Sequence, residues 1–220
     1  MSKPLNSIQG MERMKLFTAE RAPNPRRVLL FLAAKGLKPA DVGMEVVEVS
    51  LTGGENRTPD YLQMHPLGQI PALELDDGQV ITESMAICRY LEGMYPENPL
   101  FGTELMEQVR INQYGRQAEI EILVPLITAF QHGHPFWAGK YEQIPEVAPV
   151  ARRRAQSRFA YFDRRLQVVP FLAGNALSVA DLTLYAALDF GRLAGLKVDE
   201  QHPHLLAFYQ RMHERFNDIR

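Results

Sequence analysis

The sequence has 220 residues, of which 46% are hydrophobic and 23% are charged, and these proportions are typical of a globular protein. The formal net charge is −2, so the composition indicates no nucleic-acid-binding surface. The sequence has no run of about 18 apolar residues, which a membrane span would need, and residues 1–10 lack the apolar stretch of a secretory signal. We therefore expect a cytoplasmic protein of one large or two small domains that binds neither nucleic acid nor membrane.

The first half of the chain alternates strand and helix signals. Residues 15–18 and 44–49 are predicted strands, and residues 26–35 between them show the periodicity of a helix. Asn24 would cap this helix, and Pro25 would occupy its first position. A strand, a helix and a strand within about 35 residues predict a βαβ unit with two parallel strands.

A hairpin and another helix complete this half. Residues 58–62 begin a short helix, and residues 72–75 and 79–81 are strands that meet at an Asp-Asp-Gly turn. Residues 83–94 then form an apolar helix. Together these elements predict one four-stranded mixed sheet in the order βαβ-ββα.

Strand signals disappear in the second half of the chain, which we expect to be all helical. Residues 103–130 form a long helical pattern in which Pro125 predicts a kink, and residues 146–168 form a second one. Ser178 and Asp181 form a capping box that starts a third helix, and a last helix follows from His202-Pro203 to about Phe216.

The change in composition near residue 95 marks a domain boundary. We expect a polar extension at residues 1–13, an α/β domain at 14–95, a linker at 96–102 and an all-helical domain at 103–220.

Residues 65–73, with the sequence HPLGQIPAL, predict a turn that enters an apolar strand through a proline. Proline cannot donate a backbone hydrogen bond, so the N–H and C=O groups of Ile70 are free to pair with the peptide group of a ligand. The bond between Ile70 and Pro71 is also expected to be cis, because a cis peptide costs little only before proline.

Glu83 and Ser84 stand at the start of an apolar helix. A helix N-terminus offers free N–H groups and a partial positive charge. A ligand carboxylate would fit against Ser84 and these amides, and a ligand ammonium would fit against Glu83. Residues 65–73, which we call the proline loop, and this helix start together indicate a small ligand that has both a peptide bond and a free amino-acid end.

The chain resembles the soluble glutathione transferase superfamily, and within it the bacterial branch. The resemblance rests on four strings in the family's order: PRRV at 25–28, LGQIP at 67–71, the ES, AI and YL pairs of 83–91, and SVAD at 178–181. It implies a thioredoxin-like N-terminal domain joined to an all-α domain, in a homodimer. It also implies glutathione as a substrate, an apolar electrophile as the second substrate, and no metal.

Matching positions carry the family's glutathione contacts onto this sequence. The cysteinyl backbone of glutathione would bind at the proline loop, and its γ-glutamyl end would bind at the acid and the hydroxyl. The loop with Asn56 and Arg57 lies where the family contacts the glycyl carboxylate or the γ-glutamyl group. The residues expected to bind glutathione are Ile70, Pro71, Glu83, Ser84, Gln69 and Arg57.

This sequence departs from the family pattern at the catalytic position. Counted back from Val28, the position that holds serine or cysteine in many members is Ala22, and the first strand offers Phe17 and Thr18 in place of a tyrosine. We therefore expect Asn24 to assist the glutathione thiolate, with Thr18 as a second candidate, because an amide can donate a hydrogen bond to it. A role for Asn24 as a cap alone is the alternative.

Cys88 is the single cysteine, so the chain can form no internal disulfide and no redox pair of cysteines, which fits a reducing compartment. We interpret it as a small buried helix residue, with a catalytic nucleophile as the alternative. Tyr114, Phe136 and Trp137 are candidates for the pocket of the second substrate, although ordinary packing would explain them equally well.

The sequence thus favours an enzyme of detoxification that stabilises the glutathione thiolate and directs it at an electrophilic small molecule. Two alternatives remain open. One is a glutathione-dependent disulfide reductase or peroxidase, and the other is a binding or regulatory protein that keeps the fold without catalysis.

Overall fold

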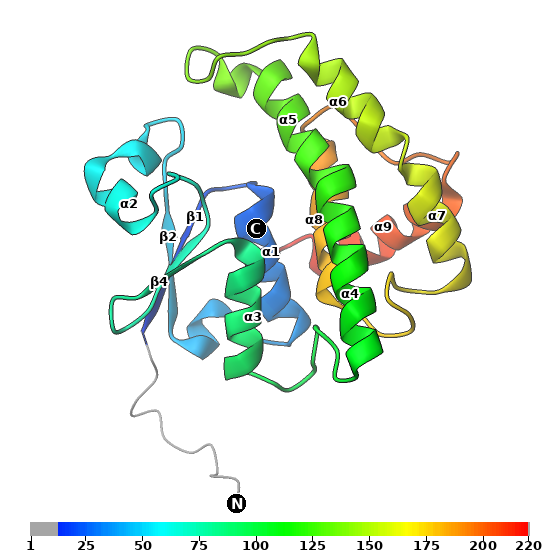
Figure 1. Cartoon of the computed structure of the whole chain (residues 1–220), viewed down its shortest axis with the longest axis horizontal. Coiled ribbons are helices and arrows are strands. Elements are labelled where there is room, and N and C mark those ends of the chain that lie inside the picture. Colours follow the sequence, from blue (N-terminus) through cyan, green and yellow to red (C-terminus); the bar gives the residue numbers. More distant parts are fainter. Residues whose placement is uncertain (1–12, 220) are drawn as a thin grey trace, which may run out of the picture.

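The computed structural model describes residues 13–219, so all but the last residue of the expected polar extension lies outside them. A sheet with its helices is followed by a helical part (Figure 1). The strands are β1 (Met14–Thr18), β2 (Met44–Glu48), β3 (Ala72–Glu74) and β4 (Val80–Thr82). The α-helices are α1 (Pro23–Ala34), α2 (Pro59–Met64), α3 (Ser84–Met94), α4 (Leu105–Ala118), α5 (Val124–Gly133), α6 (Val147–Gln156), α7 (Phe159–Val168), α8 (Val179–Gly191) and α9 (Pro203–Phe216).

The sheet has the predicted mixed character. Its strand order is β2-β1-β3-β4, with β1 parallel to β2 and antiparallel to β3, and with β3 antiparallel to β4. Alternation along β1 buries Met14 and Leu16 and leaves Lys15 exposed, as expected for a strand with one face on a core. Helices α1 and α3 lie between the sheet and the helical part, whereas α2 lies on the outer side (Figure 1).

Helix α1 starts earlier than the sequence predicted. Pro23 is its first residue and Ala22 occupies the N-cap position without a side-chain cap, so the expectation that Asn24 caps this helix is wrong. Both Pro23 and Pro25 suit a first turn, because proline fixes φ and lacks an N–H that would be unpaired there. The earlier proline begins the helix, and Asn24 becomes its second residue.

The long helix expected over residues 103–130 is interrupted before Pro125, where the sequence predicted a kink. Residues Glu119–Leu123 form a π-helical segment between α4 and α5. Pro125 has no N–H to donate to the carbonyl four residues back, and Val124 donates instead to the Glu119 carbonyl, five residues back.

The single helix expected over residues 146–168 is wrong, because α6 and α7 are separate helices. The Ser157 hydroxyl donates to the Arg154 carbonyl at 2.7 Å, and the Arg158 N–H donates to the Ala155 carbonyl at 3.0 Å. A serine side chain that bonds the preceding turn competes with the regular helix ladder, and it ends α6 here.

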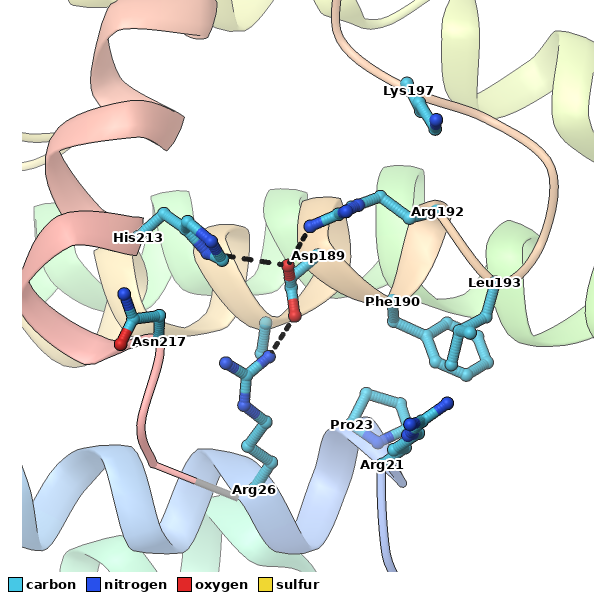
Figure 2. A pocket seen from close by; sticks show the side chains of 11 residues that line it. Arg21, Pro23, Arg26, Asp189, Phe190, Arg192, Leu193, Lys197, His213 and Asn217 are labelled. Carbon is cyan, nitrogen blue, oxygen red and sulfur yellow. Dashed lines mark hydrogen bonds and ion pairs between the residues drawn. The ribbon is translucent and has the colours of Figure 1, made fainter.

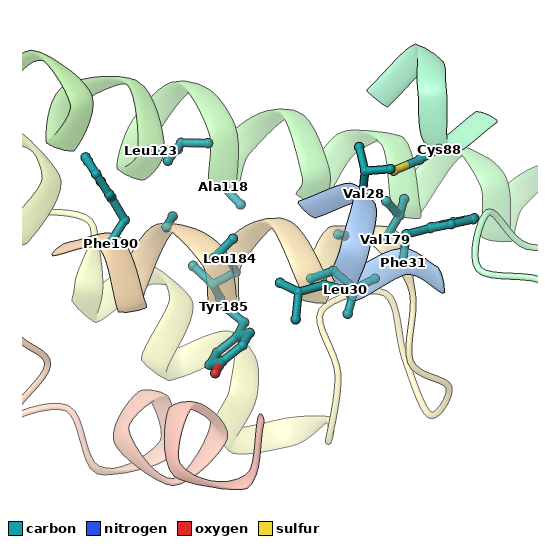
Figure 3. Close-up of a cluster of buried hydrophobic side chains, with 14 of the residues drawn as sticks. Val28, Leu30, Phe31, Cys88, Ala118, Leu123, Val179, Leu184, Tyr185 and Phe190 are labelled. Atoms are coloured by element: carbon teal, nitrogen blue, oxygen red, sulfur yellow. The ribbon is translucent and has the colours of Figure 1, made fainter. Parts of the chain in front are cut away.

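Helix α8 is the centre of the helical part, and it is buried along almost its whole length. The predicted capping box is confirmed: the Ser178 N–H and hydroxyl both donate to Asp181 Oδ2, at 2.9 and 2.7 Å. Apolar side chains of α1, α3, α4 and α8 form one continuous core that includes Cys88, which is fully buried (Figure 3). The two halves of the chain therefore share their core.

Among residues 13–219, no helix is both long and apolar enough to cross a membrane. The same residues contain no group of three or more histidine, cysteine, aspartate or glutamate side chains placed to hold a metal ion.

Candidate functional site

The proline loop leaves a length of backbone unpaired. The peptide bond between Ile70 and Pro71 is cis, as predicted. Neither the N–H nor the C=O group of Ile70 is hydrogen-bonded within the described part of the chain, so both are available to a ligand's peptide group. Gly68 makes the preceding turn with a φ of +59°, and a Cβ there would stand 2.7 Å from the Asn56 carbonyl oxygen, so the turn requires glycine.

Side chains from the segment around α2 hold this loop in place. Asn56 Nδ2 donates to the Gly68 carbonyl at 2.7 Å, and the Tyr61 hydroxyl donates to the Gln69 carbonyl at 2.7 Å. Arg57 Nη1 donates to the Leu67 carbonyl at 3.2 Å, while its guanidinium remains exposed at the surface. Tyr61 is not among the residues that the sequence predicted for the site. It lies three residues after the Thr58 cap of α2, and burial raises its pKa to about 12.

Glu83 and Ser84 stand at the N-terminus of α3, as the sequence predicted. Glu83 is the N-cap residue, and its side chain is exposed although its φ is +66°, a value that few residues other than glycine adopt. Ser84 is buried and is the first helical residue. The N–H groups of Ser84, Met85 and Ala86 have no partner among residues 13–219, so this helix end offers donors to an anion.

Arg27 lies behind Ser84, and it is not among the residues that the sequence predicted for the site. Its Nη1 donates to Ser84 Oγ at 2.9 Å and to Glu119 Oε1 at 3.4 Å. The residue is fully buried, and this burial lowers the pKa of its guanidinium, an effect that nearby Glu119 opposes. One signal was available, because Arg27 lies one helical turn before Phe31, on the apolar face of the predicted helix.

The first turn of α1 has very few free donors. Pro23 and Pro25 have no N–H, and the Arg26 N–H donates to the Ala22 carbonyl at 3.2 Å. The N–H of Asn24 is therefore the one backbone donor of this turn left without a partner in the described chain, and its side chain is half-buried. Thr18, the second catalytic candidate, is buried at the end of β1.

A cavity of about 460 Å³ adjoins the same turn, on the side that faces α8 and α9 (Figure 2). Asp189 stands at its centre and pairs with Arg26, with Arg192 at 3.7 Å and with His213 at 3.9 Å. Its remaining walls include Lys197, Phe190 and Leu193.

The three aromatic residues predicted to form a second-substrate pocket do not line this cavity. Tyr114 lies under the Arg165 guanidinium at 4.8 Å, on the face of α4 toward α7. Phe136 and Trp137 pack edge to face at 5.1 Å in a short 3₁₀ turn after α5, and Phe136 also contacts Phe130. Within residues 13–219, no ring contact joins Tyr114 to Phe136 or Trp137.

A mixed sheet with a cis-proline loop, followed by an all-helical part, is the arrangement of a thioredoxin-like domain joined to a helical domain. The sequence matches two family models, for the glutathione S-transferase N-terminal domain over residues 12–93 and for the glutathione S-transferase C-terminal domain over residues 120–215. The chain belongs to the glutathione S-transferase family, which uses glutathione as a substrate.

Individual relatives agree with this assignment. "Glutathione S-transferase 2" of Saccharomyces cerevisiae is 33% identical over 212 residues, which are 94% of this chain and 90% of that protein. The solved structure of Gtt2 from Saccharomyces cerevisiae is similar with a TM-score of 0.85 and 32% identity, covering 92% of this chain and 97% of that one. A maleylacetoacetate isomerase of Pseudomonas aeruginosa is 37% identical over 97 residues, which are 44% of each chain.

Proposed function

We propose that this protein is a glutathione transferase that binds glutathione between the proline loop and the N-terminus of α3 and directs its thiolate at an electrophilic small molecule. The proposal rests on two sets of polar groups that have no hydrogen-bond partner among the described residues, one at Ile70 and one at the N-terminus of α3. The Ile70 peptide groups match the cysteinyl backbone of glutathione, and Ser84 with the free N–H groups of α3 matches its γ-glutamyl carboxylate. Exposed Glu83 provides the partner for the γ-glutamyl ammonium, and Gln69 and Arg57 flank the glycyl end.

Activation of the thiol is assigned to the first turn of α1. A helix N-terminus lowers a thiol pKa through its partial positive charge. Asn24 brings to this turn its unpaired backbone N–H and a side-chain amide, both of which can donate to a thiolate. Thr18 remains the second candidate.

A mechanism based on a protein cysteine is disfavoured. Ala22 stands at the family's catalytic position, and Cys88 is fully buried, with its pKa raised by burial to about 12. This observation favours conjugation over a reductase that depends on a cysteine of its own. One relative is named an isomerase. Isomerisation is therefore an alternative, because the same bound thiolate could attack the substrate of such a reaction.

The second substrate is proposed to be an apolar electrophile held near the helical part, with Tyr114, Phe136 and Trp137 as candidate contacts. Removal of such electrophiles would make the reaction one of detoxification in the cytoplasm. Phe136 and Trp137 lie together and half-buried, which supports a shared apolar surface at the end of α5.

A homodimer is proposed as well. The ribbons of α3 and α4 run near each other in the fold (Figure 1), and both helices carry exposed apolar side chains. These exposed residues are Met94 on α3 and Leu105, Met106 and Val109 on α4. Burying this surface against a second copy of the chain across a two-fold axis would remove it from water.

Two measurements on the purified protein test the proposed function. Calorimetric titration with glutathione should show saturable binding, and an activated aryl halide should be conjugated to glutathione faster with protein than without it. Absence of binding would contradict the proposal as a whole. Binding without conjugation, together with reduction of a glutathione mixed disulfide, would favour the reductase, and binding with neither reaction would favour a non-catalytic protein.

A further inference from the structure

Arg27 is a buried cation with too few partners. Its side chain is 1% exposed, and two contacts of Nη1, with Ser84 and Glu119, are its only hydrogen bonds within the described chain. Its Nε and Nη2 atoms are buried without a hydrogen-bond partner among the described residues. A buried charge is costly unless its hydrogen bonds are satisfied, so packing alone does not account for Arg27.

Lys35, the C-cap residue at the other end of α1, is a buried cation whose hydrogen bonds are satisfied. Its side chain is also 1% exposed, but its Nζ donates to Glu92 at 2.7 Å and to the carbonyls of Glu97 and Asn98 at 2.9 and 3.1 Å. All three ammonium protons therefore have an acceptor. The two residues have equal burial but differ in their partners, and this contrast singles out Arg27.

The contact between Arg27 and Ser84 fixes the direction of the serine hydroxyl. Because Nη1 donates to Ser84 Oγ, the hydroxyl proton must point away from Arg27, and it has no acceptor within residues 13–219. A donor to the oxygen also polarises the O–H bond and makes it a better donor in its turn. The hydroxyl, with the positive charge behind it, is thus prepared to bind an anion in front of α3.

Glu119 holds Arg27 from the helical part of the chain. It belongs to the π-helical segment before Pro125, and its second oxygen accepts a hydrogen bond from Arg116 at 2.6 Å. The chain of contacts from Arg116 through Glu119 and Arg27 to Ser84 therefore crosses from one half of the fold to the other.

We infer that Arg27 is a positioning residue for the α-carboxylate of the γ-glutamyl group: it orients and polarises Ser84, and the helical part supports it through Glu119. The inference rests on the proposed binding of glutathione and goes beyond it, because it names a residue that contacts no ligand and yet sets selectivity for one carboxylate. The ligand feature that Arg27 recognises indirectly is the negative charge of that carboxylate.

The test is a double-mutant cycle read by calorimetric titration. Arg27→Met, Ser84→Ala and the double variant are each titrated with glutathione and with γ-aminobutyryl-cysteinylglycine, which lacks the α-carboxylate. Arg27→Met should weaken glutathione binding about tenfold or more, the effect of one hydrogen bond to a charged group, and should leave the affinity for the analogue unchanged. In the Ser84→Ala background the same change should cost much less, because the two residues act as one unit.

Two further variants separate positioning from stability. Lys35→Met removes an equally buried, ion-paired cation from the C-cap of α1, and it should lower the unfolding temperature without changing the affinity for glutathione. Arg27→Lys keeps the charge and should retain part of the selectivity for glutathione over the analogue. If Arg27→Met does not fold, Glu119→Gln, which keeps the shape but removes the charge that holds Arg27, carries the same comparison.

Equal losses of affinity for glutathione and for the analogue, or full additivity in the cycle, would overturn the role of Arg27 while leaving the proposed function intact. Failure of the unchanged protein to bind glutathione would instead overturn the proposed function. The two failures are therefore distinguishable in one set of titrations.

Discussion

Arg26 and Arg27 are neighbours in the sequence, but their side chains bond residues of different helices. Arg26 faces the helical part, where it pairs with Asp189, donates to the Ile219 carbonyl at 2.8 Å and lies over the Tyr185 ring. Arg27 points toward Ser84 of α3 at the proposed glutathione site, and it also bonds Glu119 of the π-helical segment. Successive residues of a helix are about 100° apart around its axis, so one dipeptide serves two interfaces.

At the residue scale, the first prediction concerns Ser84. Ser84→Ala removes a hydroxyl at the free N-terminus of α3, and a hydrogen bond to a charged group contributes about 1.5–3 kcal/mol. The dissociation constant for glutathione should therefore rise roughly 10- to 150-fold, measured by calorimetric titration. Ser157→Ala, which alters a serine at the end of α6, serves as the control and should bind as the parent does. An unchanged constant in Ser84→Ala would remove this residue from the site.

The second prediction concerns Asn24. Asn24→Ala should raise the pKa of the bound glutathione thiol and slow conjugation, because the side-chain amide no longer donates to the thiolate. The ultraviolet absorbance of the thiolate, titrated against pH in the complex, measures the shift.

Cys88→Ser is the comparison for Asn24. It should leave the titration and the reaction intact, although a hydroxyl in this core site lowers stability. Loss of activity in Cys88→Ser together with a normal titration in Asn24→Ala would reverse the assignment of the catalytic group.

At the scale of the element, the start of α8 has a predictable response to pH. Asp181 is fully buried, and burial raises its pKa to about 6 despite the hydrogen bonds that it accepts from Ser178 and Leu172. The folded chain therefore holds this proton more tightly than the unfolded chain does. The contribution of Asp181 to the free energy of unfolding is complete below about pH 4, and about 3 kcal/mol of it is lost as the pH rises through 6.

Urea unfolding of the parent and of Asp181→Asn between pH 4 and pH 7 measures this contribution. The amide does not titrate, so the stability of the parent relative to the variant should decrease as the pH rises. Parallel stability curves for the two proteins would show that Asp181 has an ordinary pKa in the folded chain.

At the scale of the whole molecule, the surface of α3 and α4 predicts the oligomeric state. Sedimentation equilibrium at micromolar concentration should give twice the chain mass of 25.0 kDa. Leu105→Glu with Met106→Glu should shift the protein toward the single-chain mass, because burying two carboxylates without partners is costly.

Val168 provides the matched control for the dimer. It is 71% exposed at the end of α7 and is not one of the four residues of the proposed dimer surface, so Val168→Glu should leave the mass unchanged. A parent protein that sediments as a single chain would contradict the dimer, and an effect of Val168→Glu equal to that of the α4 variant would show that the surface was assigned wrongly.

Local signals in the sequence determined the order of the elements, the βαβ-ββα sheet and the start of α8. They also determined the cis bond at Pro71 and the positions of Glu83 and Ser84, since each depends on a few neighbouring residues whose backbone preferences agree. Local signals were less reliable where two residues competed for one role: Pro23 displaced Asn24 from the cap of α1, and Ser157 divided a long helical pattern into α6 and α7.

Only the tertiary structure decided what lies behind the site. Arg27 bonds Ser84 and Glu119, which lie 57 and 92 positions away in the sequence. Arg26 pairs with Asp189, which lies 163 positions away. No periodicity or motif of one segment encodes such pairs, because they form only when packing brings separate helices together. The sequence therefore determined which groups we propose for glutathione binding, and the packing of α1 between α3 and the helical part decided which charges lie behind them.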